Sequence, residues 1–138
     1  MKLRIDRDIL SEMVRASRAA APLEACGLVG GRAGRLTRLY NLTNLDASAE
    51  HYMLVPEEQF AAVRDMRERG LELLAIWHSH PATPARMSEE DLKLAFTPDV
   101  AYLILSLAGP GAPELKGFTV RDARAEPVDL EIKEVESA

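Results

Sequence analysis

The sequence predicts one domain of the mixed α/β (α+β) class, with a central mixed β-sheet flanked by about three helices. Two apolar runs, 73–77 and 101–107, are typical of strands buried on both faces of a sheet. Between them lie segments whose apolar residues recur at helical spacing, and Gly and Pro separate the elements. With 138 residues and no repeat or linker, the chain fits a single domain over residues 1–138.

Local patterns predict each element of the first half. Ile9, Met13 and Ala16 recur near helical spacing, and Pro22 stops that helix. Glycines then punctuate the end of a short apolar strand that begins at Glu24. The predicted order is a strand over 2–6, a helix over 7–20, strands over 24–31 and 36–42 that pair as a hairpin, a polar loop over 43–50 and a strand over 52–55.

The second half begins with a helix that Pro56 opens and Gly70 ends, because Pro suits a first helical turn and Gly a C-terminal cap. Phe60, Val63 and Met66 are expected on one side of this helix. The predicted order continues with a strand over 71–80, a loop rich in Pro and Ala over 81–87, a helix from Ser88, a strand over 101–107, a turn over 109–113 and strands over 114–121 and 127–135.

Composition excludes several classes of protein. The formal net charge of −5 and the pI near 5.2 argue against a nucleic-acid module, whose usual footprint is a basic face. No apolar run approaches the ~20 residues that cross a bilayer, and Asp6 and Asp8 interrupt any apolar core of a secretory signal. Cys26 is the single cysteine, so no internal disulfide forms. We expect a cytoplasmic protein with no nucleic-acid or membrane partner.

The chemistry is concentrated in His78-Ser79-His80-Pro81, followed six residues later by Ser88-Glu89-Glu90-Asp91. Residues 78 and 80 leave the same face of a strand, and Pro81 ends that strand at a sheet rim. Asp91, about one turn into the next helix, brings a carboxylate to the same point. Two His and one carboxylate leave a fourth tetrahedral position open, as in catalytic rather than structural zinc sites.

Each motif also has an ordinary structural interpretation. A His-x-His pair in a strand is more often a core or surface pair than a ligand set, and Ser88 with Asp91 fits a helix capping box. Both interpretations of Ser88 are compatible with each other. A hydrolytic site also needs a general base, for which Glu24 is the candidate, although the residue pattern alone does not bring it beside His78.

These residues together resemble the JAMM (MPN+) zinc metallopeptidase family in its short prokaryotic form. The resemblance extends over nearly the whole chain, with no departure at any motif position. It implies the MPN fold, one zinc ion per chain held by His78, His80 and Asp91, Glu24 as general base and Ser88 as a hydrogen-bond donor to the oxyanion. The segments that carry it are Glu24-Ala25-Cys26-Gly27, Pro56-Glu57-Glu58-Gln59-Phe60, His78-Ser79-His80-Pro81, Ser88 and Asp91.

The resemblance further implies a peptidase or isopeptidase that hydrolyses the bond after the C-terminal Gly-Gly tail of a ubiquitin-like sulfur-carrier protein. The short segments 43–50 and 97–100 offer a small docking surface, consistent with one such partner. We expect the tail to bind by strand addition at a sheet edge. The sequence leaves the oligomeric state, the carrier and the leaving group open.

Two other functions fit parts of the pattern. A non-catalytic MPN scaffold that binds protein partners usually lacks the Glu or the His pair, which this chain retains. A relative of the RadC-type, DNA-associated proteins usually has Asn between the histidines and an added N-terminal helical region; Ser79 and the acidic pI count against it. Of the remaining residues, Trp77 and Cys26 are expected in the core, and His51 at the surface.

Overall fold

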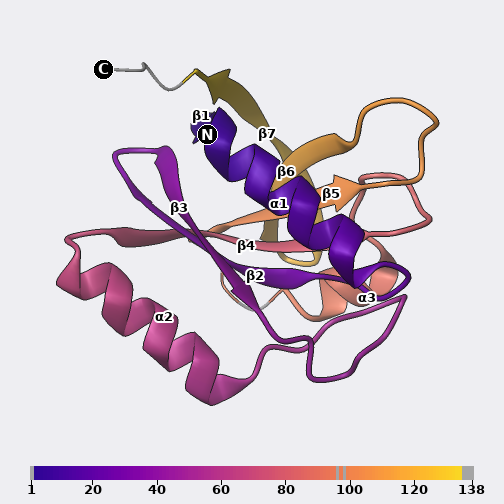
Figure 1. Ribbon diagram of the computed structural model, residues 1–138, viewed down its shortest axis with the longest axis horizontal. Helices are drawn as coiled ribbons and strands as arrows, with labels where there is room; N and C mark the ends of the chain where they lie inside the picture. Colours follow the sequence, from indigo (N-terminus) through magenta and orange to yellow (C-terminus); the bar gives the residue numbers. More distant parts are fainter. Residues whose placement is uncertain (1, 96, 98, 135–138) are drawn as a thin grey trace.

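The computed structural model describes residues 2–95, 97 and 99–134, and its strands curve into a closed barrel (Figure 1). The barrel order is β1-β3-β2-β4-β5-β6-β7. Pairing is parallel at β1–β3, β1–β7 and β4–β5 and antiparallel elsewhere, so the predicted mixed sheet is confirmed. The strands are β1 (Lys2–Asp6), β2 (Cys26–Arg32), β3 (Arg35–Leu42), β4 (Glu72–His80), β5 (Ala101–Ser106), β6 (Glu114–Arg121) and β7 (Arg124–Lys133).

Three helices flank this barrel in the described part of the chain: α1 (Arg7–Ala20), α2 (Pro56–Glu68) and α3 (Glu89–Lys93). The two long helices pack on different faces of β4. Trp77 joins the cluster that contains Met13 of α1, whereas Ile76 joins the cluster that contains Met66 of α2. Strand β4 is therefore buried on both faces, as its apolar run predicts.

Two expectations in the 50–66 region are wrong. Residues 52–55 form no strand but only an isolated bridge between Leu54 and Asn44. Phe60 is 74% exposed, whereas Ala62 and Met66 are buried. Residues three apart drift around a helix of 3.6 residues per turn, so the sequence pattern from Phe60 to Met66 does not stay on one face. The predicted end of α2 is confirmed, because Gly70 follows it with a φ of +71°.

The last strand begins at Arg124 rather than at the expected residue 127. Asp122 and Ala123 both have positive φ, 53° and 59°, as the two central residues of a tight hairpin turn require. Neither is Gly, so the sequence lacks the usual signal for this turn. Residue 135, the last of the expected strand, lies outside the described residues.

The barrel determines where the polar motifs meet. Strands β4 and β5 run parallel and in register from Ala75 with Ala101 to His80 with Ser106, so both end at the same rim. Cys26 at the start of β2 pairs with His78, which brings the preceding residue pair 24–25 to that rim as well. The short helix α3 follows the 81–88 loop on the same side (Figure 1).

Candidate metal centre

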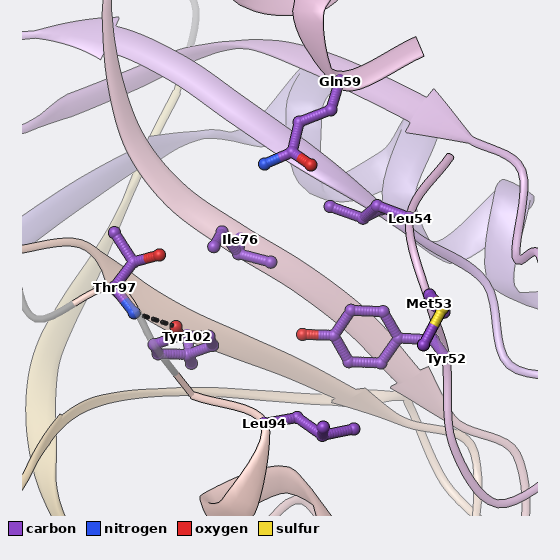
Figure 2. A pocket seen from close by; sticks show the side chains of 8 residues that line it. All are labelled: Tyr52, Met53, Leu54, Gln59, Ile76, Leu94, Thr97 and Tyr102. Atoms are coloured by element: carbon purple, nitrogen blue, oxygen red, sulfur yellow. Dashed lines mark hydrogen bonds between the residues drawn. The ribbon is translucent and has the colours of Figure 1, made fainter. Parts of the chain in front are cut away.

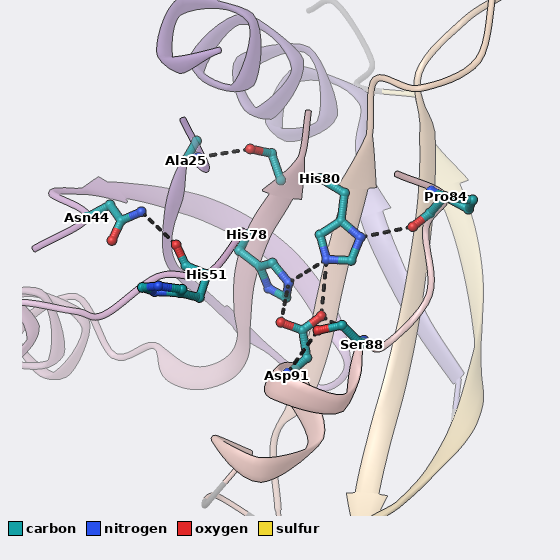
Figure 3. Close-up of polar contacts among 9 residues, drawn as sticks. Ala25, Asn44, His51, His78, His80, Pro84, Ser88 and Asp91 are labelled. Carbon is teal, nitrogen blue, oxygen red and sulfur yellow. Dashed lines mark hydrogen bonds and ion pairs between the residues drawn. The ribbon is translucent and has the colours of Figure 1, made fainter. Parts of the chain in front are cut away.

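His78, His80 and Asp91 meet at the rim of the barrel (Figure 3). The two histidines project from one face of β4, two residues apart. Nε2 of His78 lies 3.1 Å from Nε2 of His80 and 3.2 Å from Oδ1 of Asp91, and Nε2 of His80 lies 3.1 Å from Oδ2 of Asp91. All three side chains are buried.

A capping box orients the Asp91 carboxylate. Ser88 Oγ accepts a hydrogen bond from the N–H of Asp91, and the N–H of Ser88 donates to Asp91 Oδ2, both at 3.0 Å. This reciprocal pair begins α3 and stabilises its first turn. Because Ser88 Oγ acts here as an acceptor, its own O–H remains available to donate toward the cleft.

The donor set fits a metal ion. The Pro84 carbonyl can only accept, so Nδ1 of His80, 2.9 Å away, must be the donor in that bond. In the neutral ring this leaves the lone pair of Nε2 facing His78 and Asp91. A proton on one of these side chains can satisfy only one or two of the contacts among His78, His80 and Asp91. A metal cation between them can accept a lone pair from all three side chains at once. Ligands about 2.0–2.1 Å from a tetrahedral zinc lie about 3.3 Å from one another, close to the separations found here.

The local electrostatics favour the metal-binding protonation state at His78 and Asp91 but oppose it at His80. Burial lowers the pKa of His78, which keeps its imidazole neutral. Burial raises the pKa of Asp91, but hydrogen bonds from the two histidines outweigh it and hold the pKa far below its usual range. Burial lowers the pKa of His80, but its bonds to Asp91 and Pro84 outweigh that effect and raise the pKa. A proton and a metal ion therefore compete for the same place beside His80.

Glu24 lines the same cleft as His80 and Ser88, a hollow of about 750 Å³. Only 3% of its surface is exposed, and its Oε1 has no hydrogen-bond partner among the described residues. Burial is the main cause that raises the pKa of Glu24 to about 8, with Asp91 adding to the rise and His80 opposing it. An unpartnered buried carboxyl with a pKa near neutrality is suited to accept and return a proton.

Sequence reasoning missed three residues that shape this site. Ser79, between the two histidines, accepts a hydrogen bond from the Ala25 N–H. The ring of Tyr52 stacks on His78 with centroids 4.6 Å apart. Asn44 bonds to the main chain of Glu24 and to that of His51, the second contact being drawn in Figure 3. His51, expected to be an isolated surface residue, lines the cleft. The contacts are long-range, so no local pattern signals them.

Beyond Tyr52 lies a second, apolar hollow of about 240 Å³ (Figure 2). Tyr52 separates it from His78, and Ile76 and Tyr102 line it from β4 and β5.

Two expected core residues behave as predicted, since Trp77 and Cys26 are fully buried. Burial raises the pKa of the Cys26 thiol to about 12, which makes it a poor nucleophile.

A barrel with two His and one Asp at its rim, beside a buried Glu, has the donor set and the carboxyl that a hydrolytic metal site requires. The chain belongs to the family described as prokaryotic homologs of the JAB domain, whose model matches residues 6–121, and it is a peptidase of that family. Among solved structures, a Desulfitobacterium hafniense protein has a TM-score of 0.89 at 44% identity, with 96% of this chain and 94% of that chain covered. A JAB1/MPN domain protein from Archaeoglobus fulgidus has the same fold, with a TM-score of 0.66 at 22% identity over 96% of this chain and 98% of that chain.

Two curated relatives have named activities. The chain is 36% identical over 130 residues to the CysO-cysteine peptidase of Mycobacterium tuberculosis. The matched region covers 91% of this chain and 89% of the relative. It is also 36% identical over 94 residues to a probable TtuB-protein conjugate cleaving protease of Thermus thermophilus. This match covers 67% of this chain and 63% of the relative.

In the described part of this chain, no helix has both the length and the apolar character needed to cross a membrane.

Proposed function

We propose that this protein is a zinc-dependent peptidase that hydrolyses the bond after the C-terminal Gly-Gly tail of a ubiquitin-like sulfur-carrier protein. The observation that carries the proposal is the convergence of His78, His80 and Asp91 beside the buried, unpaired carboxyl of Glu24. A structural site would close the fourth tetrahedral position with another ligand. No further His, Cys, Asp or Glu joins the cluster of three in the described residues, which favours an open catalytic site.

Zinc is the metal that this donor set suits best. Two imidazoles and one carboxylate, at mutual separations of 3.1 to 3.2 Å, are compatible with a small tetrahedral coordination sphere. Calcium and magnesium prefer more oxygen ligands than this cluster provides. We propose one zinc ion per chain. When bound, it supplies a Lewis acid that lowers the pKa of water from ~16 to about 7.

Two side chains beside the cluster, Glu24 and Ser88, supply proton transfer and stabilisation of the oxyanion. Glu24 takes a proton from the attacking water and returns it to the departing amine, a role that suits a buried carboxyl with an unpartnered oxygen in the cleft. The O–H of Ser88 donates to the carbonyl oxygen as negative charge develops on it. The same serine keeps Asp91 in place through the capping box, so its two roles use different parts of one hydroxyl.

The substrate follows from the relatives and from the shape of the cleft. The names of these two relatives describe cleavage of conjugates, of CysO with cysteine and of TtuB with protein. A Gly-Gly terminus has no side chains, so its main chain can come close to a buried metal site. The apolar hollow beside Tyr52 is suited to an apolar side chain a few residues before that terminus.

The closed barrel changes where the tail can lie. Each of the seven described strands has a neighbour on both sides along at least part of its length, so few main-chain groups are free for strand addition at a barrel edge. We propose that the tail instead runs beside the irregular segment 51–53, which lies next to His78 through the stacked ring of Tyr52. We also propose a cytoplasmic setting, since the one cysteine is buried and unpaired.

The test uses purified protein, zinc and ubiquitin-like carriers that bear short C-terminal extensions. Metal analysis should give about one zinc per chain, and mass spectrometry should find cleavage directly after Gly-Gly of one carrier. Chelation should abolish cleavage and added zinc should restore it. Zinc-loaded protein that leaves every carrier intact, or that cleaves them elsewhere, would contradict the proposed substrate.

A further inference from the structure

One side chain, the amide of Asn44, connects the candidate base to the loop that walls the cleft. Its Nδ2 donates to the carbonyl oxygens of Glu24 and His51, at 3.2 and 3.1 Å. Its Oδ1 accepts from the N–H groups of Asp46 and Met53, each at 3.1 Å. An amide has two donors and two acceptor lone pairs, so Asn44 uses all of its hydrogen-bonding capacity on main chain.

These bonds close residues 44–53 into a compact loop. The Asp46 bond forms a turn two residues long, and the bonds to His51 and Met53 bring the returning arm of the loop against its start. The N–H of Leu45 adds a main-chain bond to Met53 at 2.8 Å. A side chain therefore joins the two arms of this loop, where main-chain bonds would join the arms of a regular hairpin.

The same loop holds both main-chain groups of Glu24. The carbonyl accepts from Asn44, and the N–H donates to the carbonyl of Ser48 at 2.7 Å. The loop also contributes Glu50 and His51 to the cleft wall and places Tyr52 on the ring of His78. The main chain of the candidate base, the cleft wall and the ring stacked on one ligand histidine thus all involve one loop, which the Asn44 amide closes.

We propose that Asn44 is a positioning residue that fastens the 44–53 loop to the main chain of Glu24 and thereby holds the Glu24 carboxyl in the cleft. The kinetic consequence of this proposal rests on the proposed function. The attachment of the loop to Glu24 through Asn44 is independent of activity. Because Oε1 of Glu24 has no described hydrogen-bond partner, the main-chain bonds of Glu24 contribute to the position of its carboxyl. A misplacement of about 1 Å can cost about 10²-fold in rate.

Two variants distinguish the donor bonds of the Asn44 amide from its acceptor bonds. Asn44→Ala removes all four bonds. Asn44→Asp keeps both acceptor bonds and the turn, but it sets a carboxylate against the carbonyls of Glu24 and His51. Asn41→Ala is the matched control, since Asn41 is exposed in β3 and its side chain makes no hydrogen bond among the described residues. Zinc content should equal that of the wild type in all three.

Hydrogen exchange on the zinc-loaded protein tests the tie without any substrate. Asn44→Ala should raise exchange across residues 44–53 and at Glu24 by at least tenfold, while β4 and β5 stay protected. Asn44→Asp should keep Asp46 and Met53 protected and release Glu24. Unchanged exchange in both variants would overturn the proposal. If Asn44→Ala does not fold, the Asn44→Asp result alone decides.

Turnover on the cleaved carrier tests the consequence. Both variants should lower kcat by about 10 to 10²-fold with KM changed less, and Asn44→Ala should add little to the loss caused by Glu24→Gln. Additive losses, or full kcat in a variant with a released loop, would refute positioning of Glu24. A wild-type protein that cleaves no carrier would instead refute the proposed function, and the exchange data would still report on the tie.

Discussion

The main-chain N–H of Ala25 donates to Oγ of Ser79 at 2.8 Å, and the N–H of Ser79 donates back to the Ala25 carbonyl at 3.0 Å. Ser79 lies between the two histidines, and Ala25 follows Glu24. This pair of bonds therefore joins the strand that carries two candidate ligands to the residue next to the candidate base. The site is assembled by main-chain contacts as much as by its own polar side chains.

The first prediction concerns this link. Ser79→Ala should leave the buried N–H of Ala25 without an acceptor, at a cost of about 1–3 kcal/mol in the free energy of unfolding. Denaturant unfolding of zinc-free protein measures this loss. Ser11→Ala, an exposed change on α1, is the control and should alter stability by less than about 0.5 kcal/mol. Equal stability of both variants would show that the link contributes nothing.

The second prediction concerns the ligands. His78→Ala, His80→Ala and Asp91→Ala should each reduce bound zinc from about one per chain to a small fraction after dialysis, because an open site loses a third of its protein ligands. His51→Ala serves as control, since His51 pairs with Asp46 and is outside the cluster. Elemental analysis is the measurement. Full zinc content in any of the three ligand variants would remove that residue from the site.

The third prediction separates the two roles of Ser88. Ser88→Ala should lose about 1 kcal/mol of helix capping and about 10²-fold in turnover. Ser88→Asp keeps a good N-cap but cannot donate a hydrogen bond when ionised, so it should recover the stability and not the turnover. Thermal unfolding and kcat are measured side by side. Restored turnover in Ser88→Asp would leave Ser88 with the capping role alone.

The fourth prediction concerns Cys26. Because burial raises its pKa to about 12 and none of its surface is exposed, the native thiol should resist alkylation at pH 8 for hours and react within minutes in denaturant. Mass spectrometry after iodoacetamide treatment detects the label. Rapid labelling of the native protein would contradict the burial of this residue and reopen its assignment as an inert apolar side chain.

Much of the fold could be predicted because its signals are local. The apolar run before His78 identifies a strand with two buried faces, and Pro56 and Gly70 mark the ends of α2. Closure of the sheet into a barrel could not be predicted, because it depends on β1 pairing with both β3 and β7. The turn at Asp122 was missed because it uses positive φ without glycine.

The candidate site divides in the same way. His78 and His80 share a face by strand alternation, and Asp91 is one turn into a helix, so their meeting is a short-range consequence of the chain. Glu24 is more than fifty residues away, and only the pairing of β2 with β4 brings it to the cleft. Asn44 acts through side-chain bonds to four separate main-chain groups, which no periodicity in the sequence reveals.

The central claim is that three ligands hold one hydrolytic zinc ion and that Glu24 moves the proton beside it. Glu24→Gln tests it most directly, because the change removes the proton acceptor and no ligand. We expect about one zinc per chain in this variant, with carrier cleavage reduced by at least 10²-fold. A Glu24→Gln protein that carries zinc and cleaves at the wild-type rate would contradict the account.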